Sequence, residues 1–455
     1  KDQRGAFTGR NAEGEASREN DGARHHFHQQ WDMFMNCESF DVLVVGAGAA
    51  GITAALQAAR AGAAVCLVEK NGIPGGTMTV SGIHYPGIFN AWGRQVIAGI
   101  GWELVAKTLE TMERPMPDFS RTDMTRHWEH QIPLDPVIFA AIVDRELLAA
   151  GVTIKYHTML GALSGEESGW AVTLCGRDGL YEVKSKVVAD CSGDANAAKL
   201  AGYEVRTSEP CQPGTMSVYA TGYHLKSLDL DAIGNAFQEA VRKGEVCAED
   251  TGWAGGFNPN VLIKRGNNSN HISGINACDS AGRTKIEIAG RESLLRLYRF
   301  LRRQPGLEQL EFRLDGPECG VRETRTIVGE DTVTAADYAA GRKYPDALCN
   351  AFYPIDLHDA KVGLDKRGLA PGTVPQVPRG ALIPAHSRRF VAAGRLLSSD
   401  RLANSALRVQ AICMATGQAA GAMAALSAKS GADPLRLELA EIRALLKRHG
   451  AIVPE

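Results

Sequence analysis

The chain has 455 residues, with 50 Lys and Arg against 52 Asp and Glu, and 44% of its residues are hydrophobic. That length predicts two or three domains, and a chain this long can bury its cores without disulfides or metals. A net charge of −2 disfavours a nucleic-acid-binding protein, which normally carries a basic excess. The ten cysteines are scattered without a C-x-x-C pair, which disfavours zinc ribbons, ferredoxin-type clusters and a disulfide scaffold. We therefore expect reduced thiols, no metal and a cytoplasmic protein.

Residues 1–39 form a polar arm with little hydrophobic periodicity. Its three histidines, His25, His26 and His28, have no carboxylate or Cys at ligand spacing, so an exposed polar turn is a better interpretation than a metal site. We expect this arm to lie against another surface, which would fit a homo-oligomer.

The first clear pattern begins at residue 40. Residues 41–45 are a short apolar run typical of a strand, residues 52–61 predict an Ala-rich helix, and residues 63–68 predict a second strand that ends at Glu69. The turn between the first strand and the helix reads Gly-Ala-Gly-Ala-Ala-Gly and contains Gly46, Gly48, Ala49, Ala50 and Gly51.

Glycines at this spacing allow a tight turn, the close approach of a pyrophosphate, and close packing of helix on strand. The helix N-terminus adds free N–H groups and a partial positive charge for the phosphates. Glu69 follows Gly51 at the distance where a carboxylate accepts hydrogen bonds from a ribose diol. The same unit accounts for the uncharged stretch from Val42 to Ala59, which meets the crude length test for a membrane helix, so we expect no membrane segment.

The residues after Glu69 favour FAD over NAD. Lys70 is followed by a second glycine pair and a run of closely spaced hydroxyl groups: Gly75, Gly76, Thr77, Met78, Thr79, Ser81 and Gly82. Such a loop suits the ribityl–pyrophosphate of the longer cofactor, and a nicotinamide enzyme has no need of it. The sequence has no second Gly-x-Gly-x-x-Gly that would indicate a separate NAD(P)H domain, because Gly417 to Gly421 falls inside a predicted late helix.

The later elements are predicted mainly from periodicity. They are a helix over 136–150, a strand over 152–157, a hairpin of 170–175 with 181–186 around Asp178-Gly179, a strand over 187–193 that runs into a turn, a helix over 286–303, a strand over 390–394, a small-residue helix over 405–429 and a last helix over 435–449. The helix over 286–303 carries five arginines, which we interpret as a solvated basic face above a core stripe rather than as a membrane or anionic-partner surface.

In combination these blocks resemble the FAD-dependent oxidoreductase family, which is distantly related to the fumarate reductase and succinate dehydrogenase flavoproteins. The resemblance rests on residues 41–51, 69–82, 187–195, 320–330, 353–358 and 384–426, and so extends over about 40–430. It implies an α/β fold in which a Rossmann-like FAD-binding domain carries an inserted α+β substrate or cap domain. The expected parts are the arm (1–39), the FAD-binding domain (40–200 and 386–430), the cap (201–385) and a C-terminal helix (431–455).

The resemblance also assigns cofactor contacts. It implies that Gly394 and Arg395, at the end of a strand, meet the ribityl chain, and that the flavin-binding helix begins at Ala406, Leu407, Arg408 and Val409. The N-terminus of that helix would stabilise negative charge on the flavin ring. Near the adenosine half the resemblance places Cys191, Ser192, Gly193 and Asp194, and we add Met159 or Leu160 as an adenine contact through the backbone.

Catalytic residues are predicted from the need for proton transfer beside the flavin. His84, Tyr85, His358 and His386 are candidates to donate or accept that proton. Arg322, Arg325 and Arg388 are candidates to anchor a carboxylate or stabilise an enolate. For each histidine a structural hydrogen bond is the alternative, and for Arg322 and Arg325 it is pairing with Glu323 or Glu330. His84 is also a conceivable site of covalent flavin attachment, although its surroundings do not match the attachment segment of such relatives.

The sequence thus predicts an FAD-dependent dehydrogenase or reductase that acts on a small polar organic molecule. The direction of the reaction stays open, and so does the electron partner, which is oxygen, a quinone, another protein or NAD(P)H. The alternative is a non-catalytic FAD-binding module for assembly or sensing, which would need no proton-transfer groups near the flavin.

Overall fold

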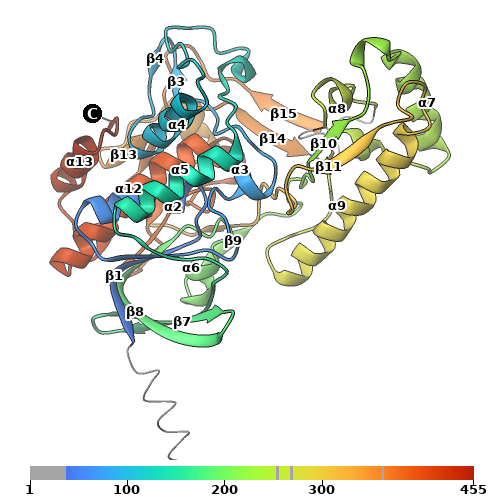
Figure 1. The fold of residues 1–455 in the computed structure, drawn as a ribbon. Helices are drawn as coiled ribbons and strands as arrows, with labels where there is room; N and C mark the ends of the chain where they lie inside the picture. The colour runs from blue at the N-terminus through green and yellow to red at the C-terminus, as the bar shows by residue number, and fades with distance from the viewer. Residues whose placement is uncertain (1–36, 253–255, 267–269, 360–362, 455) are drawn as a thin grey trace, which may run out of the picture.

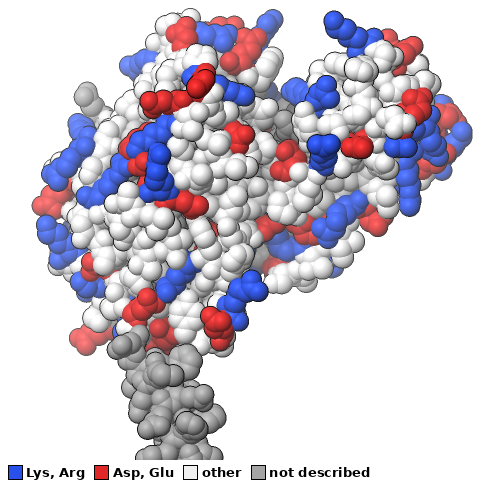
Figure 2. Space-filling view, in the orientation of Figure 1, with Lys and Arg blue, Asp and Glu red and all other residues white. Residues whose placement is uncertain are grey.

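The computed structural model describes residues 37–252, 256–266, 270–359 and 363–454. The chain forms a main body and a lobe beside it, and the hairpin of β14 (Ile355–Asp359) and β15 (Gly363–Arg367) extends from the body toward the lobe (Figure 1). Figure 2 shows positive and negative side chains intermixed over this face of the molecule. The arm residues up to 36, with their three histidines, lie outside the described residues.

A seven-stranded sheet forms the centre of the body, in the order β5-β2-β1-β8-β7-β6, with β17 also paired to β8. Strands β5, β2, β1, β8 and β17 are parallel to one another. Strand β7 is antiparallel to β8, and β6 is antiparallel to β7. The strands are β1 (Glu38–Val45), β2 (Val65–Val68), β5 (Thr153–Lys155), β6 (Met159–Glu166), β7 (Gly169–Gly176), β8 (Gly179–Asp190) and β17 (Phe390–Ala392).

The continuous apolar run of β1 reflects burial on both faces of the sheet. Val42 and Val44 point into the core shared with the helices, whereas Leu43 and Val45 point into a second core beneath the other face. A parallel strand covered on both sides has no polar face to alternate with, which is why the sequence of β1 shows no alternation.

One face of the sheet is covered by a layer of helices with α12 at its centre. They are α2 (Ala49–Arg60), α4 (Ile100–Thr111), α5 (Pro136–Ala149), α12 (Gln410–Ser430) and α13 (Leu439–Arg448), with α3 (Thr77–Val80), α10 (Ala335–Ala340) and α11 (Arg401–Leu407) beside them. The short α6 (Asn196–Leu200) lies in the core of the opposite face. Of the described helices, only α12 is long and apolar enough to cross a membrane, and 89% of its apolar window is buried inside the body.

The lobe has its own hydrophobic core. Its elements are β10 (Val218–Thr221), η2 (Leu225–Ser227), α7 (Leu230–Arg242), η3 (Ala248–Thr251), α8 (Asn260–Ile263), α9 (Ser280–Leu301) and β11 (Glu311–Leu314). On α9, Leu297 and Leu301 are buried, and four of the five arginines are exposed, so the basic face above a core stripe is confirmed for those four. Arg296 instead pairs with the buried Asp250. Leu295 is an exception, because it is exposed.

The remaining elements are short. They are β3 (Asn90–Ala91), β4 (Arg94–Gln95), η1 (His127–His130), β9 (Val205–Thr207), β12 (Arg325–Ile327), β13 (Ala347–Asn350), β16 (Gln376–Pro378), η4 (Arg379–Leu382) and η5 (Pro434–Arg436). Val333, Tyr338, Ile355 and Val377 pack into the same core as α2 and α12. No disulfide joins any two of the ten cysteines, all of which lie in the described residues.

Several predicted boundaries were wrong. Residues 181–186 and 187–190 form one strand, β8, because no turn residue separates them; its first half pairs with β7 and its second half with β17. The predicted helix over 405–429 is two helices, with Arg408 ending α11 and Val409 capping α12. Helix α9 begins six residues earlier than predicted, where Asp279 caps its N-terminus.

Candidate cofactor and active site

The turn between β1 and α2 contains two glycines that the chain itself requires. An ideal Cβ on Gly46 would lie 2.6 Å from the carbonyl oxygen of Cys191, and one on Gly51 would lie 1.7 Å from the carbonyl oxygen of Gly46. Gly46 also has a φ of +96°, which disfavours any residue with a side chain. Both positions are therefore fixed by packing of the backbone.

Gly48 differs from its two neighbours in the motif. Its φ of −75° and ψ of −174° suit any residue, and a Cβ there would have only the Cα of Gly76 within 4 Å among the described atoms, at 3.9 Å. No side chain caps the N-terminus of α2 at this position, so no side chain of the chain itself occupies the N–H groups of its first turn. A glycine that the backbone does not need, at an uncapped helix N-terminus, fits the close approach of a pyrophosphate.

Glu69 ends β2 beside this turn. Its Oε2 accepts a hydrogen bond from the Ala47 N–H at 2.8 Å, and its Oε1 accepts one from the Asn71 N–H at 2.9 Å. Burial raises the pKa of Glu69, and these two hydrogen bonds oppose that effect. Each carboxylate oxygen has a further lone pair. Glu69 thus holds the shape of the turn and still fits the role of ribose acceptor.

The second glycine pair packs directly on the first turn. Gly75 forms a short bridge with Gly48, and its N–H donates to the carbonyl oxygen of Ala47 at 2.8 Å. An ideal Cβ on Gly76, whose φ is +57°, would lie 2.9 Å from the Cα of Gly48. Helix α3 follows at once, with Met78 fully buried and Thr79 Oγ1 donating to the Pro74 carbonyl oxygen at 2.8 Å.

Residues 315–320 cover the end of this block. Lys70 pairs with Glu318, whose N–H donates to the Val80 carbonyl oxygen at 2.8 Å. Ser81 is buried, and a Cβ on Gly82 would lie 2.8 Å from Asp315 Oδ2. The block from Gly75 to Gly82 is therefore enclosed on one side by the first turn and on the other by the segment that leads out of the lobe.

Asp194 and Arg395 bind each other. Arg395 donates from Nη2 to Asp194 Oδ1 and from Nε to the Gly193 carbonyl oxygen, both at 2.7 Å, and Arg283 donates to Asp194 Oδ2 at 2.8 Å. Burial alone would raise the pKa of Asp194, but the charges of Arg395 and Arg283 lower it to about 2. The two side chains join the ends of β8 and β17, which bring Gly193 and Gly394 to the carboxyl edge of the sheet.

The remaining residues expected near the adenosine half lie at the same edge. The Thr158 N–H donates to the Glu69 carbonyl oxygen at 3.0 Å, which places Met159 and Leu160 directly after a contact with the end of β2. Cys191 is buried, and Ser192 Oγ accepts from the Asn196 N–H at 3.0 Å.

The junction of α11 and α12 carries Ala406, Leu407, Arg408 and Val409. The first two are buried in α11, and the loop before residue 88 covers the start of α12. The Ala411 N–H donates to the Pro86 carbonyl oxygen at 2.6 Å, and Gln410 Nε2 donates to the Ile83 carbonyl oxygen at 3.0 Å. One N–H group of this helix N-terminus is therefore already used by the chain.

A buried cluster of charged and polar side chains lies beside this junction. His358 Nε2 is 3.3 Å from Asp356 Oδ2, and His271 Nε2 is 2.9 Å from His358 Nδ1. Arg408 Nη2 is 3.5 Å from Asp356 Oδ2 and donates to the Asp356 carbonyl oxygen at 3.1 Å. Arg322, which is buried, donates to the Pro213 carbonyl oxygen at 2.6 Å.

The charges of this cluster act on one another. Burial and the nearby Arg408 lower the pKa of Arg322 to about 9. Burial alone would raise the pKa of Asp356, but the hydrogen bond from His358 and the charges of the two arginines lower it to about 2. The cluster therefore holds one carboxylate and two guanidinium groups, an excess of positive charge that suits an anionic or strongly polar ligand.

The structure does not bring all predicted catalytic residues together. His358 and Arg322 belong to the cluster. His84 and Tyr85 lie in the loop that contacts Gln410 at the start of α12: His84 Nε2 is 3.6 Å from Asp315 Oδ1, and the Tyr85 carbonyl oxygen accepts from Gln410 Nε2 at 3.3 Å.

The other three candidates lie elsewhere. Arg325 donates to Asn196 Oδ1 at 3.3 Å from β12. His386 and Arg388 are exposed on the loop that enters β17, whereas the glycine turns lie where the parallel strands end. Among the described residues, no group of three His, Cys, Asp or Glu side chains is arranged to hold a metal ion.

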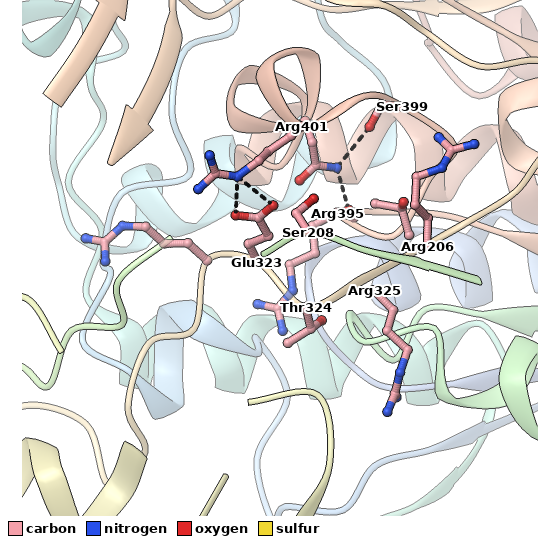
Figure 3. A pocket seen from close by; sticks show the side chains of 11 residues that line it. Arg206, Ser208, Glu323, Thr324, Arg325, Arg395, Ser399 and Arg401 are labelled. Atoms are coloured by element: carbon pink, nitrogen blue, oxygen red, sulfur yellow. Dashed lines mark hydrogen bonds and ion pairs between the residues drawn. The ribbon is translucent and has the colours of Figure 1, made fainter. Parts of the chain in front are cut away.

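A small pocket is lined both by Arg322 of the cluster and by Arg325. It encloses about 350 Å³, including its open mouth, and is lined by Arg322, Glu323, Arg395, Arg401 and Asn404 among others. Figure 3 shows Arg401 paired with Glu323, while the guanidinium groups of Arg325 and Arg206 point away from Arg401 and from each other. The arginines therefore do not converge on one point in this pocket.

Two members of the cluster were missed from the sequence. Asp356 stands two residues before His358, and alternate residues of a strand share one face, so this pair was predictable. His271 lies in a loop of the lobe and gave no signal, because nothing in the sequence relates residues 271 and 358.

The fold and these sites define a dinucleotide-binding flavoprotein with an inserted lobe. Residues 41–446 match the model of the family described as FAD dependent oxidoreductase, and the chain belongs to that family. It is an FAD-dependent enzyme, and the open face of Gly48, the uncapped start of α2 and the free lone pairs of Glu69 fit that cofactor. The two glycine turns would hold bound FAD, which would supply the redox chemistry.

No curated protein matches the chain. Among solved structures, a geranylgeranyl bacteriochlorophyll reductase-like protein of Thermoplasma acidophilum is 14% identical over 91% of this chain and 84% of that chain, with a TM-score of 0.43. The myxobacterial chondrochloren halogenase is 14% identical over 90% of this chain and 79% of that chain, also with a TM-score of 0.43. An anhydrotetracycline hydroxylase of Streptomyces rimosus is 19% identical, but the match covers only 41% of this chain and 38% of that chain, with a TM-score of 0.29.

Proposed function

We propose that the protein transfers a hydride between flavin N5 and a small polar organic substrate, either by dehydrogenating a CH–OH or CH–NH group or by reducing an activated double bond. The observation that carries the proposal is the buried cluster of Asp356, His358, His271, Arg322 and Arg408. It adjoins the junction of α11 and α12, which we expect from the family resemblance to lie beside the flavin ring.

The residues of the cluster suit the two needs of such a reaction. Arg322 and Arg408 carry buried positive charge, which binds a carboxylate or a developing enolate or alkoxide. The paired histidines hold ring nitrogens that accept or donate a proton as the hydride moves. A module that only binds FAD has no need of this arrangement, so the cluster supports turnover over an assembly or sensing role.

The test is anaerobic mixing of the FAD-loaded enzyme with a panel of sugars, hydroxy acids, amines and enoates. A substrate that is oxidised should bleach the flavin absorbance, and one that is reduced should restore the colour of chemically reduced enzyme. Arg322→Gln should weaken the response to the active compound, while Arg388→Gln, which alters an exposed residue away from the cluster, is the matched control. If no compound changes the flavin spectrum in either direction, the proposal of hydride transfer to a small molecule fails.

The electron partner that completes the cycle is a separate question. Reoxidation of the bleached enzyme by oxygen, by a soluble quinone or by NAD(P)⁺ distinguishes the candidates by rate. We propose no membrane or nucleic-acid partner for this step.

A further inference from the structure

Three side chains form a continuous line of hydrogen bonds inside the cluster. Asp356 and His358 belong to β14 of the body, and His271 belongs to the lobe. The distances are 3.3 Å from Asp356 Oδ2 to His358 Nε2 and 2.9 Å from His358 Nδ1 to His271 Nε2. Both ring nitrogens of His358 are therefore engaged by protein, one on each side.

The lobe holds His271 firmly in this line. The His271 N–H donates to the Glu249 carbonyl oxygen at 3.0 Å, and the next residue, Ile272, pairs with Gly214. On the preceding side, the Asn270 carbonyl oxygen accepts from Thr215 Oγ1 at 2.8 Å. His271 is only 4% exposed. Because three neighbouring residues are fixed to the lobe, His271 meets His358 only where the lobe is seated on the body.

The charges around the line fix its protonation state. It is faced by Arg322 from the segment that leaves the lobe and by Arg408 from α11, while His127 and Lys366 lie further out on η1 and β15. Burial and Arg322 lower the pKa of His358 to about 4 and that of His271 to about 2. At neutral pH the line thus consists of one carboxylate and two uncharged imidazoles.

Uncharged imidazoles carry one proton each, and the partners decide where it sits. Asp356 is a carboxylate and only accepts, so His358 must donate to it from Nε2. The Nδ1 of His358 is then a lone pair, and it accepts the proton that His271 carries on Nε2. Asp356 and His271 therefore hold the ring of His358 in one orientation, one at each ring nitrogen.

We propose that His271 is a positioning residue in this site: it holds His358 in the tautomer that carries its proton on Nε2, against Asp356, and makes that state depend on the lobe being seated. The catalytic use of these three side chains rests on the proposed function. The protonation state of His358, however, can be measured without any turnover. It assigns a role in the site to a lobe residue that lies outside every motif of the sequence.

The first experiment uses the FAD-loaded wild-type enzyme with ring-¹⁵N-labelled histidine. The ¹⁵N and ¹H resonances of His358, assigned by their loss in His358→Gln, report which nitrogen carries the proton. We expect His358 to be uncharged at pH 7, with its proton on Nε2. A protonated His358 at pH 7, or one with its proton on Nδ1, would overturn the inference, and neither result would bear on whether the flavin reacts.

The second experiment compares two variants of His271. Gln retains an N–H donor that reaches His358 Nδ1, whereas Phe removes the donor and keeps a ring of similar size. Loss of a hydrogen bond to uncharged His358 raises its pKa, by roughly half to one pH unit. We expect that shift in His271→Phe and not in His271→Gln, at equal FAD content. The same shift in both variants, or in neither, contradicts the positioning role.

With a substrate from the bleaching panel, the variants extend the test to turnover. We expect the acid limb of kcat/KM to move to higher pH in His271→Phe, with a fall in kcat and little change in KM, and to return in His271→Gln. A fall in kcat with an unchanged pH profile indicates a merely structural role for His271 and would overturn the inference. If no substrate is found, the proposed function fails, while the NMR comparison still decides the inference.

Discussion

Gly51 approaches Gly46 so closely that an ideal Cβ at position 51 would lie 1.7 Å from the carbonyl oxygen of Gly46. Gly48, between them in the same turn, has ordinary backbone angles and would place its Cβ 3.9 Å from its nearest described neighbour, the Cα of Gly76. One motif therefore contains glycines of two kinds. Gly46 and Gly51 serve the packing of the chain, and Gly48 leaves room for the cofactor.

The first prediction follows from this difference. Gly48→Val should fold normally and lose FAD, because its side chain fills the space that the pyrophosphate needs. We expect binding to weaken on the order of tenfold or more, which corresponds to about 1.4 kcal/mol or more. The ratio of flavin to protein absorbance in the purified variant, together with its circular dichroism, measures both outcomes.

Gly51→Ala is the comparison for that variant. Its methyl group collides with the Gly46 backbone, so we expect it to lose the fold as well as the colour. A folded Gly48→Val protein that is as yellow as the wild type would show that the pyrophosphate does not bind at this turn.

The second prediction concerns Glu69. Removal of the carboxylate in Glu69→Ala leaves the N–H groups of Ala47 and Asn71 without their acceptor, in addition to any loss of ribose contacts. We expect the apoprotein to lose about 1–3 kcal/mol of stability. Glu69→Gln keeps one acceptor oxygen and should lose less. Urea unfolding of the two apoproteins tests this, and equal stability of Glu69→Ala and wild type would show that the turn does not depend on the carboxylate.

The sequence was sufficient to predict the cofactor turn, because its signal is local. The strand, the glycine spacing and Glu69 all fall within 32 residues of chain and occur in the structure as expected. Helix α7 was missed although Asp229 caps it and Ile233, Phe237 and Ala240 are spaced for one buried face. The cap and the spacing of these residues would have been sufficient to predict the helix.

The polar cluster was harder to predict for a physical reason. Asp356 and His358 are two residues apart on one strand, but His271 and Arg408 come from segments far away in the sequence, and only the seating of the lobe on the body brings them together. His386 and Arg388 illustrate the converse. They precede a correctly predicted strand, yet they lie at its amino end, and the cofactor turns lie at the carboxyl ends of the parallel strands.

The third prediction is a pH dependence of stability that belongs to Asp194. Its pKa is lowered to about 2 in the folded protein, against about 3.9 in an unfolded chain. A group with a lowered folded pKa stabilises the fold above its unfolded pKa, and that contribution is lost as the pH falls through the folded value. Asp194 should therefore contribute about 2 kcal/mol above pH 4, and this should disappear between about pH 4 and pH 2.

The comparison with Asp194→Asn isolates this contribution from other carboxylates. The variant loses the ion pairs with Arg395 and Arg283 and should be less stable than wild type at pH 6. The difference between the two proteins in urea unfolding should shrink as the pH is lowered toward 2. A difference that stays constant from pH 6 to pH 2 would mean that the Asp194 charge does not stabilise the folded state.

The fourth prediction concerns the contact of α12 with α2, the helix that carries the cofactor turn. A Cβ on Gly421 would lie 2.3 Å from the carbonyl oxygen of Ala54, which is backbone and cannot move aside without shifting α2. An exposed helical Gly→Ala change gains up to about 1 kcal/mol from helix propensity, but the collision in a packed interface costs about 1–3 kcal/mol or more. We therefore expect Gly421→Ala to lower the thermal midpoint and to loosen FAD binding, because α2 must shift. Gly368→Ala, where a Cβ meets nothing within 4 Å among the described atoms, should change stability by no more than about 0.5 kcal/mol. A Gly421→Ala protein at least as stable as wild type would show that the two helices do not approach as closely as 2.3 Å implies.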